Sequence, residues 1–259
     1  MIRTAVIPAG GYGSRMEPIT KAIPKPMLPI IRKPVIHYIV EEAIQSGLKH
    51  IIIVAGYKAN VIKDYFFSEQ EFDSRSYGPK NYFEDADIEF ISQDEPKGLA
   101  DAILCTKNSI NNEKFAILLG DDIFRSDIPG TAQLCKNMQG NHMIGCLEMP
   151  KYKLRNYGVI ISDENENPFN ISKIIEKPNY EVSSNLAVAG RYVFGPSVFN
   201  ALETVFAEKD ISGNLTDAVN LMIDSGEIVH GLKMDGIRYD VGNENEYITT
   251  LKAAIEERW

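Results

Sequence analysis

The 259-residue sequence has few cysteines, a single tryptophan and no long uninterrupted apolar stretch. Its three cysteines, Cys105, Cys135 and Cys146, are an odd number without the close spacing of a metal site, so we expect reduced thiols in the core. No apolar run approaches the length of a membrane span, and the first residues lack the apolar run of a signal peptide. We therefore expect a cytoplasmic protein without a membrane partner.

An excess of positive charge is also missing. The net charge is -9, whereas proteins that bind duplex nucleic acid need many Lys and Arg residues to neutralise phosphates. We therefore expect no nucleic-acid partner. A small polyanion is still compatible with this composition, because a few cations gathered in one place are enough to bind it.

What remains is the composition of an ordinary folded protein, with 44% hydrophobic and 24% charged residues. The length suits one domain, which we expect to span residues 1–259. Short apolar runs at Thr4–Pro8, His50–Ala55, 88–92 and 115–119 alternate with helical patterns at 34–46, 59–67 and 99–110. This alternation predicts parallel strands joined by crossover helices.

The second half of the chain is richer in strands. Strands are predicted at 143–147, 159–161, 172–176 and 188–194, with few helices between them, and helices at 197–206, Leu215–Asp224 and 244–257. The polar segment 68–87 is expected to be a loop or an insertion. Together the two halves predict an α/β fold with a Rossmann-like mixed, mainly parallel sheet flanked by helices.

The strongest motif follows the first strand directly and reads Ala9-Gly10-Gly11-Tyr12-Gly13-Ser14-Arg15, continuing through a proline-rich loop to Lys25. Free N–H groups in a tight glycine turn form a concave anion site, to which Arg15 and Lys25 add positive charge. Glycines alone are as often only a turn. Two cations beside them on an acidic chain favour a bound triphosphate. Met16 replaces the third glycine of a dinucleotide fingerprint, and no Walker A lysine follows.

Acidic residues form the second group of candidates. Asp121 and Asp122 follow the strand predicted at 115–119, and Asp240 follows another strand-like segment. Taken alone, Gly-Asp-Asp is more readily a turn than a metal site. Glu176 beside Lys177 would likewise be a solvated ion pair.

Across these segments the sequence resembles the bacterial and archaeal sugar-1-phosphate nucleotidyltransferases. The resemblance covers nearly the whole chain and rests on the glycine loop, the Pro-Lys-Pro-Met-Leu-Pro stretch and the segments 98–102, 119–124, 157–159, 176–178, 190–193 and 239–242. It implies a glycosyltransferase-A-like fold. It also implies that a sugar phosphate attacks the α-phosphate of a nucleoside triphosphate in line and releases pyrophosphate. A glycosyltransferase would instead use an Asp-x-Asp motif, which is not found in the expected setting.

The resemblance implies a role for each matching residue. Arg15 and Lys25 would be catalytic. The nucleotide would contact Ala9, Gly10, Gly11, Gly13, Arg15, Lys25, Gln93, Gly98 and Asp121. The sugar phosphate would contact Asp122, Gly158, Glu176, Lys177 and Val188. Asp121 and Asp240 would hold Mg²⁺. Residues from 1 to about 125 would thus form a nucleotide-binding half and residues from about 126 to 259 a sugar-binding half.

Specificity is also implied by resemblance. Segments 20–25, 190–193 and 215–218 look most like those of UDP-glucose pyrophosphorylases, which implies UTP and glucose 1-phosphate as substrates. Related thymidylyltransferases typically carry Asn where this chain has Asp122, whereas segment 55–63 is similar to glucose-1-phosphate cytidylyltransferases. Transfer of a thymidylyl or cytidylyl group and a non-catalytic regulatory homologue stay as alternatives. The family implies a homo-oligomer, either a dimer or a tetramer.

Overall fold

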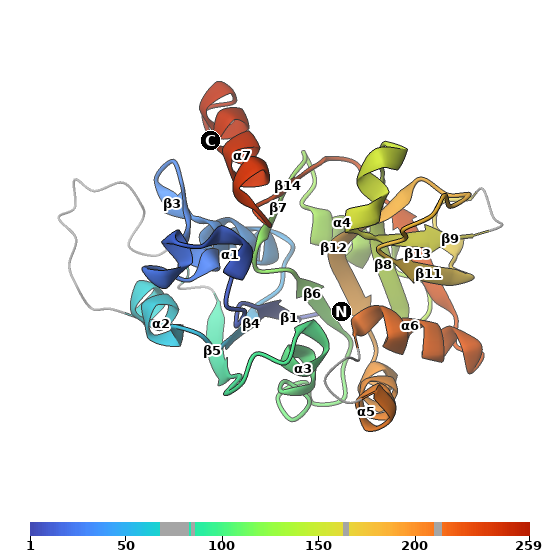
Figure 1. Cartoon of the computed structure of the whole chain (residues 1–259). Coiled ribbons are helices and arrows are strands. Elements are labelled where there is room, and N and C mark those ends of the chain that lie inside the picture. Colours follow the sequence, from blue (N-terminus) through green and yellow to red (C-terminus); the bar gives the residue numbers. More distant parts are fainter. Residues whose placement is uncertain (68–82, 84–85, 163–165, 210–213) are drawn as a thin grey trace.

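The computed structural model describes residues 1–67, 83, 86–162, 166–209 and 214–259 (Figure 1). The loop predicted over 68–87 therefore lies almost entirely outside the described residues. Within the described part of the chain, every helix is too short or too polar to span a bilayer.

A mixed sheet forms the centre of the molecule, with the strand order β10-β13-β8-β12-β6-β1-β4-β5. These strands are β1 (Thr4–Pro8), β4 (His50–Ala55), β5 (Asp87–Ser92), β6 (Phe115–Leu118), β8 (His142–Glu148), β10 (Phe169–Asn170), β12 (Leu186–Phe194) and β13 (Val229–Lys233). Of the seven neighbouring pairs on this path, four are parallel and three antiparallel. Two further strands, β9 (Gly158–Ile161) and β11 (Lys173–Glu176), extend from β12. The predicted α/β fold is confirmed.

Strand residues alternate between two apolar cores, because successive side chains of a strand point to opposite faces. On β1, Ala5 and Ile7 belong to one core and Val6 to the other. Figure 1 shows α1 (Val35–Gln45) and α4 (Gly130–Asn137) on one side of the sheet. On the other side lie α3 (Leu99–Leu104), α5 (Ser197–Lys209) and α6 (Leu215–Asp224). Each fully buried Ile stabilises the fold by roughly 1.5–3 kcal/mol. Helices that cover both faces of the sheet therefore explain why strands with apolar residues on both sides are stable.

Smaller elements shape the edge of the sheet where the glycine loop begins. The strand β7 (Asp122–Arg125) follows β6 and pairs antiparallel with β14 (Ile237–Asp240). The remaining elements are η1 (Ser14–Met16), η2 (Ile19–Lys21), η3 (Lys25–Met27), β2 (Pro29–Ile30), β3 (Lys33–Pro34), α2 (Ala59–Phe67), η4 (Lys151–Asn156) and α7 (Glu244–Glu256). The β7–β14 pair brings a segment from near the end of the chain to the residues that follow β6.

Two expectations from the sequence are wrong, and one helix was missed. The helix predicted at 99–110 ends at Leu104, where Thr106 Oγ1 donates to the Ile103 carbonyl at 2.7 Å and favours a turn over further helix. The helix α4 was missed, because it begins at a Pro-Gly pair that usually marks a turn. Cys105 is exposed and is not a core thiol, whereas Cys146 is buried as expected.

The two predicted halves of the chain share one sheet. β12, from the second half, lies between β8 and β6, and β6 belongs to the first half. The division at about residue 125 therefore stays a prediction about ligand contacts rather than a boundary in the sheet.

Candidate active site

The glycine-rich loop leaves the end of β1 and continues through the short turns η1, η2 and η3. The Ala9 N–H donates to the Val54 carbonyl at 2.7 Å, which holds the start of the loop against β4. A Cβ atom on Gly10 would lie 2.6 Å from Oε1 of Gln93. A larger residue there would have to displace the Gln93 side chain, so the backbone of the loop lies directly against it.

Lys25 joins this loop to the end of β6. Its ammonium group forms an ion pair with Oδ2 of Asp121, and its side chain is 9% exposed. Burial acts to raise the pKa of Asp121, but Lys25, with smaller contributions from Arg238 and Arg15, offsets it and holds this pKa below its usual value. Asp121 is therefore an anion at neutral pH, and both predicted cations, Lys25 and Arg15, act on it.

Asp240 reaches the same place from the other end of the sequence. It is the last residue of β14 and lies opposite Asp122 of β7, and the Val241 N–H donates to the Asp121 carbonyl at 3.1 Å. The pKa of Asp240 is raised, mainly by burial and partly by the charge of Asp121, although Arg238 opposes the change. The structure thus brings together the two carboxylates that were predicted to share a metal ion.

Asp122 is more deeply buried than these two carboxylates. Its side chain is 0% exposed, and its Oδ2 accepts a hydrogen bond from Arg238 Nε at 2.5 Å. Burial raises the pKa of Asp122 to about 7 against the opposing charge of Arg238. Direct contact with the sugar phosphate, expected from the sequence, does not agree with this burial.

The other four residues predicted to contact the sugar phosphate lie around β9 and β11. Gly158 pairs with Glu176, and a Cβ on Gly158 would lie 3.4 Å from both Glu176 Oε2 and Val188 Cγ2. Thr216 Oγ1 donates to Glu176 Oε2 at 2.8 Å, and Lys177 Nζ lies 3.3 Å from Glu176 Oε1. The Glu176 carboxylate is therefore held by Thr216 and lies against the backbone of Gly158.

Gln93, one of the two residues predicted to bind the base, lies beside the glycine loop, and its side chain contacts the other, Gly98. The Gln93 amide nitrogen donates to the Gly98 carbonyl at 3.1 Å and to Asp101 Oδ2 at 2.7 Å. Both of its hydrogens are used in these bonds, which leaves Oε1 as an acceptor that faces Gly10. The side chain is 3% exposed, so its orientation is fixed before any ligand binds.

The sequence analysis gave no role to two buried arginines near the site, Arg191 and Arg238. Arg191 is 0% exposed and binds Glu42 of α1 with an Nη2–Oε2 distance of 2.6 Å, and the same nitrogen donates to the Asp122 carbonyl at 2.7 Å. Arg238 binds Asp122 and also Asp240, at 3.2 Å. The sequence did contain a signal for the pair of Arg191 and Glu42. Glu42 lies among the apolar residues of α1, and a carboxylate on a buried helix face needs a charged partner.

Gly190 gives a test of this buried arrangement. It has φ of 72°, and a Cβ there would lie 2.6 Å from Asp122 Oδ2. The variant Gly190→Ala is expected to lose about 1–3 kcal/mol from strained backbone and roughly as much again from overpacking, measured by denaturant unfolding. The matched control is Gly226→Ala, because Gly226 also has positive φ but no atom within 4 Å of its Cβ position. Equal losses in the two variants would contradict a close fit between Gly190 and Asp122.

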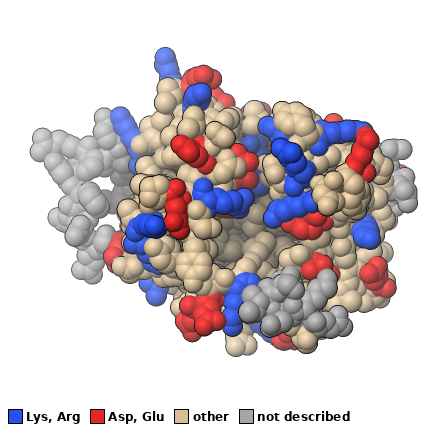
Figure 2. Space-filling view, in the orientation of Figure 1, with Lys and Arg blue, Asp and Glu red and all other residues tan. Residues whose placement is uncertain are grey.

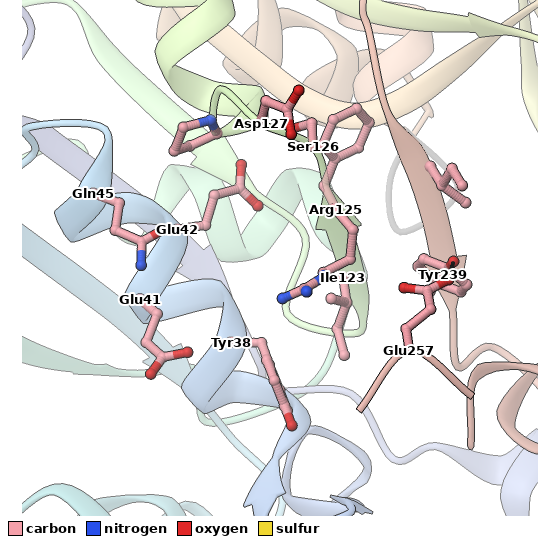
Figure 3. Close-up of a pocket in the computed structure, with 13 residues that line it drawn as sticks. Tyr38, Glu41, Glu42, Gln45, Ile123, Arg125, Ser126, Asp127, Tyr239 and Glu257 are labelled. Atoms are coloured by element: carbon pink, nitrogen blue, oxygen red, sulfur yellow. Dashed lines mark hydrogen bonds between the residues drawn. The ribbon is translucent and has the colours of Figure 1, made fainter. Parts of the chain in front are cut away.

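Hollows in the surface lie both near these residues and away from them. On the face shown in Figure 2, which is hollowed near its middle, basic and acidic side chains are interspersed. A cavity of about 530 Å³ adjoins Asp240 and is lined also by Tyr157, Arg238 and Thr250. Figure 3 shows a different cavity, of about 460 Å³, between α1 and the β7–β14 pair, with Tyr38, Arg125 and Tyr239 on its walls. The described residues that line this second cavity include none of the predicted site residues.

Several known proteins are similar to this chain over nearly its whole length. A family model described as nucleotidyl transferase matches residues 4–257. A UTP--glucose-1-phosphate uridylyltransferase of Staphylococcus epidermidis is 40% identical, with 99% of this chain and 93% of that protein covered. A UTP--glucose-1-phosphate uridylyltransferase of Bacillus subtilis is 39% identical, with 99% of this chain and 92% of that protein covered. A UDP-glucose pyrophosphorylase whose crystal structure contains UDP-glucose is 34% identical and superposes with a TM-score of 0.89. The match covers 100% of both chains.

Proposed function

The chain belongs to the nucleotidyl transferase family, and from this premise we propose that it transfers a uridylyl group from UTP to glucose 1-phosphate, giving UDP-glucose and pyrophosphate. The observation that carries the proposal is the meeting of Lys25 with Asp121 and Asp240, three charged residues from distant parts of the sequence. The names of the relatives supply the nucleotide and the sugar.

We assign the reacting phosphates to the space bordered by the glycine loop, Lys25 and Arg15. The attacking oxygen of glucose 1-phosphate is already an anion, so no general base is needed. The activation barrier arises because two anions must be brought together in line. Cations held in fixed positions lower this barrier. An ammonium group has three donors, so Lys25 can keep its bond to Asp121 and still donate to a phosphate oxygen.

We assign Mg²⁺ to Asp121 and Asp240, as expected from the sequence. The donor set fits this ion, because Mg²⁺ is usually bound by one or two carboxylates, with waters and substrate phosphates completing its shell. Burial raises the pKa of Asp240 and the negative charge of Asp121 adds to this rise, so the two carboxylates repel each other; both are partly exposed. When bound, the ion would neutralise phosphate charge.

The sugar is assigned to the group around Gly158. Glu176, whose orientation is fixed by Thr216, would accept hydrogen bonds from sugar hydroxyls, while Lys177 would bind the sugar phosphate. Val188 and Gly158 would supply backbone contacts. Asp122 is removed from this set because of its burial.

Gln93 supports a uracil over a cytosine base. Its free acceptor Oε1 can accept a hydrogen bond from N3–H of uracil, whereas cytosine presents an acceptor at N3 and would leave both groups unpaired. An unpaired buried acceptor costs about 1–3 kcal/mol. Thymine has the same N3–H, so discrimination against a thymidylyl donor does not come from Gln93. A regulatory homologue without activity is not favoured, since Arg15, Lys25, Asp121 and Asp240 are all present.

The test is a panel of nucleoside triphosphates incubated with Mg²⁺ and glucose 1-phosphate, with pyrophosphate release as the readout. We expect fastest release with UTP, and only when both substrates are present. Release without glucose 1-phosphate, or a clear preference for CTP, would contradict the proposal. A cytoplasmic location and assembly into a dimer or tetramer stay predictions, and light scattering in solution measures the assembly.

A further inference from the structure

Arg238 touches residues on both sides of the candidate site. Its Nε donates to Asp122 Oδ2 at 2.5 Å, its Nη2 to Asp240 Oδ2 at 3.2 Å, and its Nη1 to the Val188 carbonyl at 3.3 Å. The guanidinium carbon also lies 4.5 Å from the centre of the Tyr157 ring. Its side chain is 7% exposed, so these contacts are largely shielded from water.

The partners of Arg238 belong to different parts of the site. Asp240 ends β14 in the acidic pair near Lys25, whereas Val188 lies on β12 beside Gly158 and Glu176. Asp122 lies on a third strand, β7. The Arg238 side chain therefore connects the two carboxylates, Asp121 and Asp240, with the strand β12 that borders the predicted sugar-binding residues.

We propose that Arg238 is a positioning residue that fixes the Asp240 carboxylate relative to the sugar pocket. This inference rests on the proposed function, which assigns the metal ion to Asp121 and Asp240 and the sugar to the residues around Gly158, including Val188. Arg238 acts through these residues and does not itself touch the substrates. In-line attack depends on the separation of the two reactants, and a displacement of about 1 Å can cost about 10²-fold in rate.

Arginine is suited to this task in a way that lysine is not. The planar guanidinium presents five donors in a fixed arrangement, so it can bind three acceptors on three strands and stack on an aromatic ring at the same time. A lysine ammonium is a point charge on a flexible stem. A gain in stability is a weaker explanation of the pair, because buried ion pairs are often no more stabilising than apolar residues of similar volume.

The experiment compares Arg238→Lys, the double variant Asp122→Asn/Arg238→Met and the control Arg125→Lys. The double variant removes both members of the buried pair, so that neither charge is left alone. Arg125 is an exposed arginine on the neighbouring strand β7, which makes it a matched control. The measurements are Tm, kcat, KM for each substrate, and the Kd of Mn²⁺ from electron paramagnetic resonance without substrates.

We expect both Arg238 variants to be folded and to bind Mn²⁺ roughly 10–100-fold more weakly, with a lower kcat and with KM for glucose 1-phosphate raised more than KM for UTP. Arg125→Lys should match the unaltered chain. Wild-type Mn²⁺ binding and kinetics in either folded Arg238 variant, or a loss confined to Tm, would overturn the inference. If the unaltered chain forms no UDP-glucose, the proposed function fails, and weaker Mn²⁺ binding in the variants would still support a positioning role for Arg238.

Discussion

Replacing Lys25 by methionine is expected to lower kcat for UDP-glucose formation by roughly 10²- to 10³-fold, the loss found when one preorganised donor to developing charge is removed. Lys25 is held beside Asp121 by an ion pair, with 9% of its side chain exposed. Methionine keeps the length and the apolar stem but loses the charge. Without this charge, less of the repulsion between the two phosphates is offset. Quenched-flow or steady-state assays of pyrophosphate release measure the effect.

The control for this variant is Lys107→Met. Lys107 also binds a carboxylate, Glu203, at 2.5 Å, but it lies at the surface, on the side of the sheet that carries α3 and α5. Its replacement should leave kcat unchanged and cost at most about 1 kcal/mol of stability. Because Lys25→Met leaves Asp121 without its ion pair, Tm is measured for both variants. A Lys25→Met protein that is folded and turns over at a near-normal rate would refute the assignment.

Replacing Asp121 by asparagine is expected to lower kcat by about 10²-fold or more, since metal activation contributes several kcal/mol of charge stabilisation. The amide keeps the shape of the side chain but loses the negative charge of one of the two proposed ligands. The Mg²⁺ concentration needed for half-maximal activity should rise as well. Titration of activity with Mg²⁺ separates a weakened metal site from a general loss of fold.

Asp127→Asn is the matched control, because Asp127 is an exposed aspartate shortly after β7 and lies outside the predicted site. It should keep the wild-type Mg²⁺ dependence. If Asp121→Asn also kept this dependence together with a normal kcat, Asp121 would not be a metal ligand. The lowered pKa of Asp121, which Lys25 imposes against burial, would then be a purely structural feature.

The main strands were predictable because each carries apolar residues on both faces. β1 and β4 were predicted with the bounds that the structure gives. β7 and β14 were harder, because short strands with charged residues such as Arg125 and Arg238 resemble solvated loops in the sequence. Their pairing is set by long-range contacts, which no local pattern encodes. Local propensity therefore explains the central sheet better than it explains the small sheet next to the site.

The candidate site was predictable where a motif continues a strand. The glycine loop follows β1 and Asp121 follows β6, so the topology of parallel strands brings them to one edge. The depth of Asp122 was not predictable, because neighbouring residues in a turn can point to solvent or to the core. Its burial depends on Arg238, which is 116 positions away in the sequence. The roles of the remaining residues stay predictions until a ligand is bound.

A crystal structure with UTP, a non-reactive analogue of glucose 1-phosphate and Mg²⁺ tests the central claim most directly. The account predicts Lys25 Nζ within about 3 Å of a phosphate oxygen, Arg15 turned toward the same phosphates, and the ion between Asp121 and Asp240. Phosphates bound elsewhere, such as in the cavity of Figure 3 beside Arg125, with Lys25 still bound only to Asp121, would contradict it.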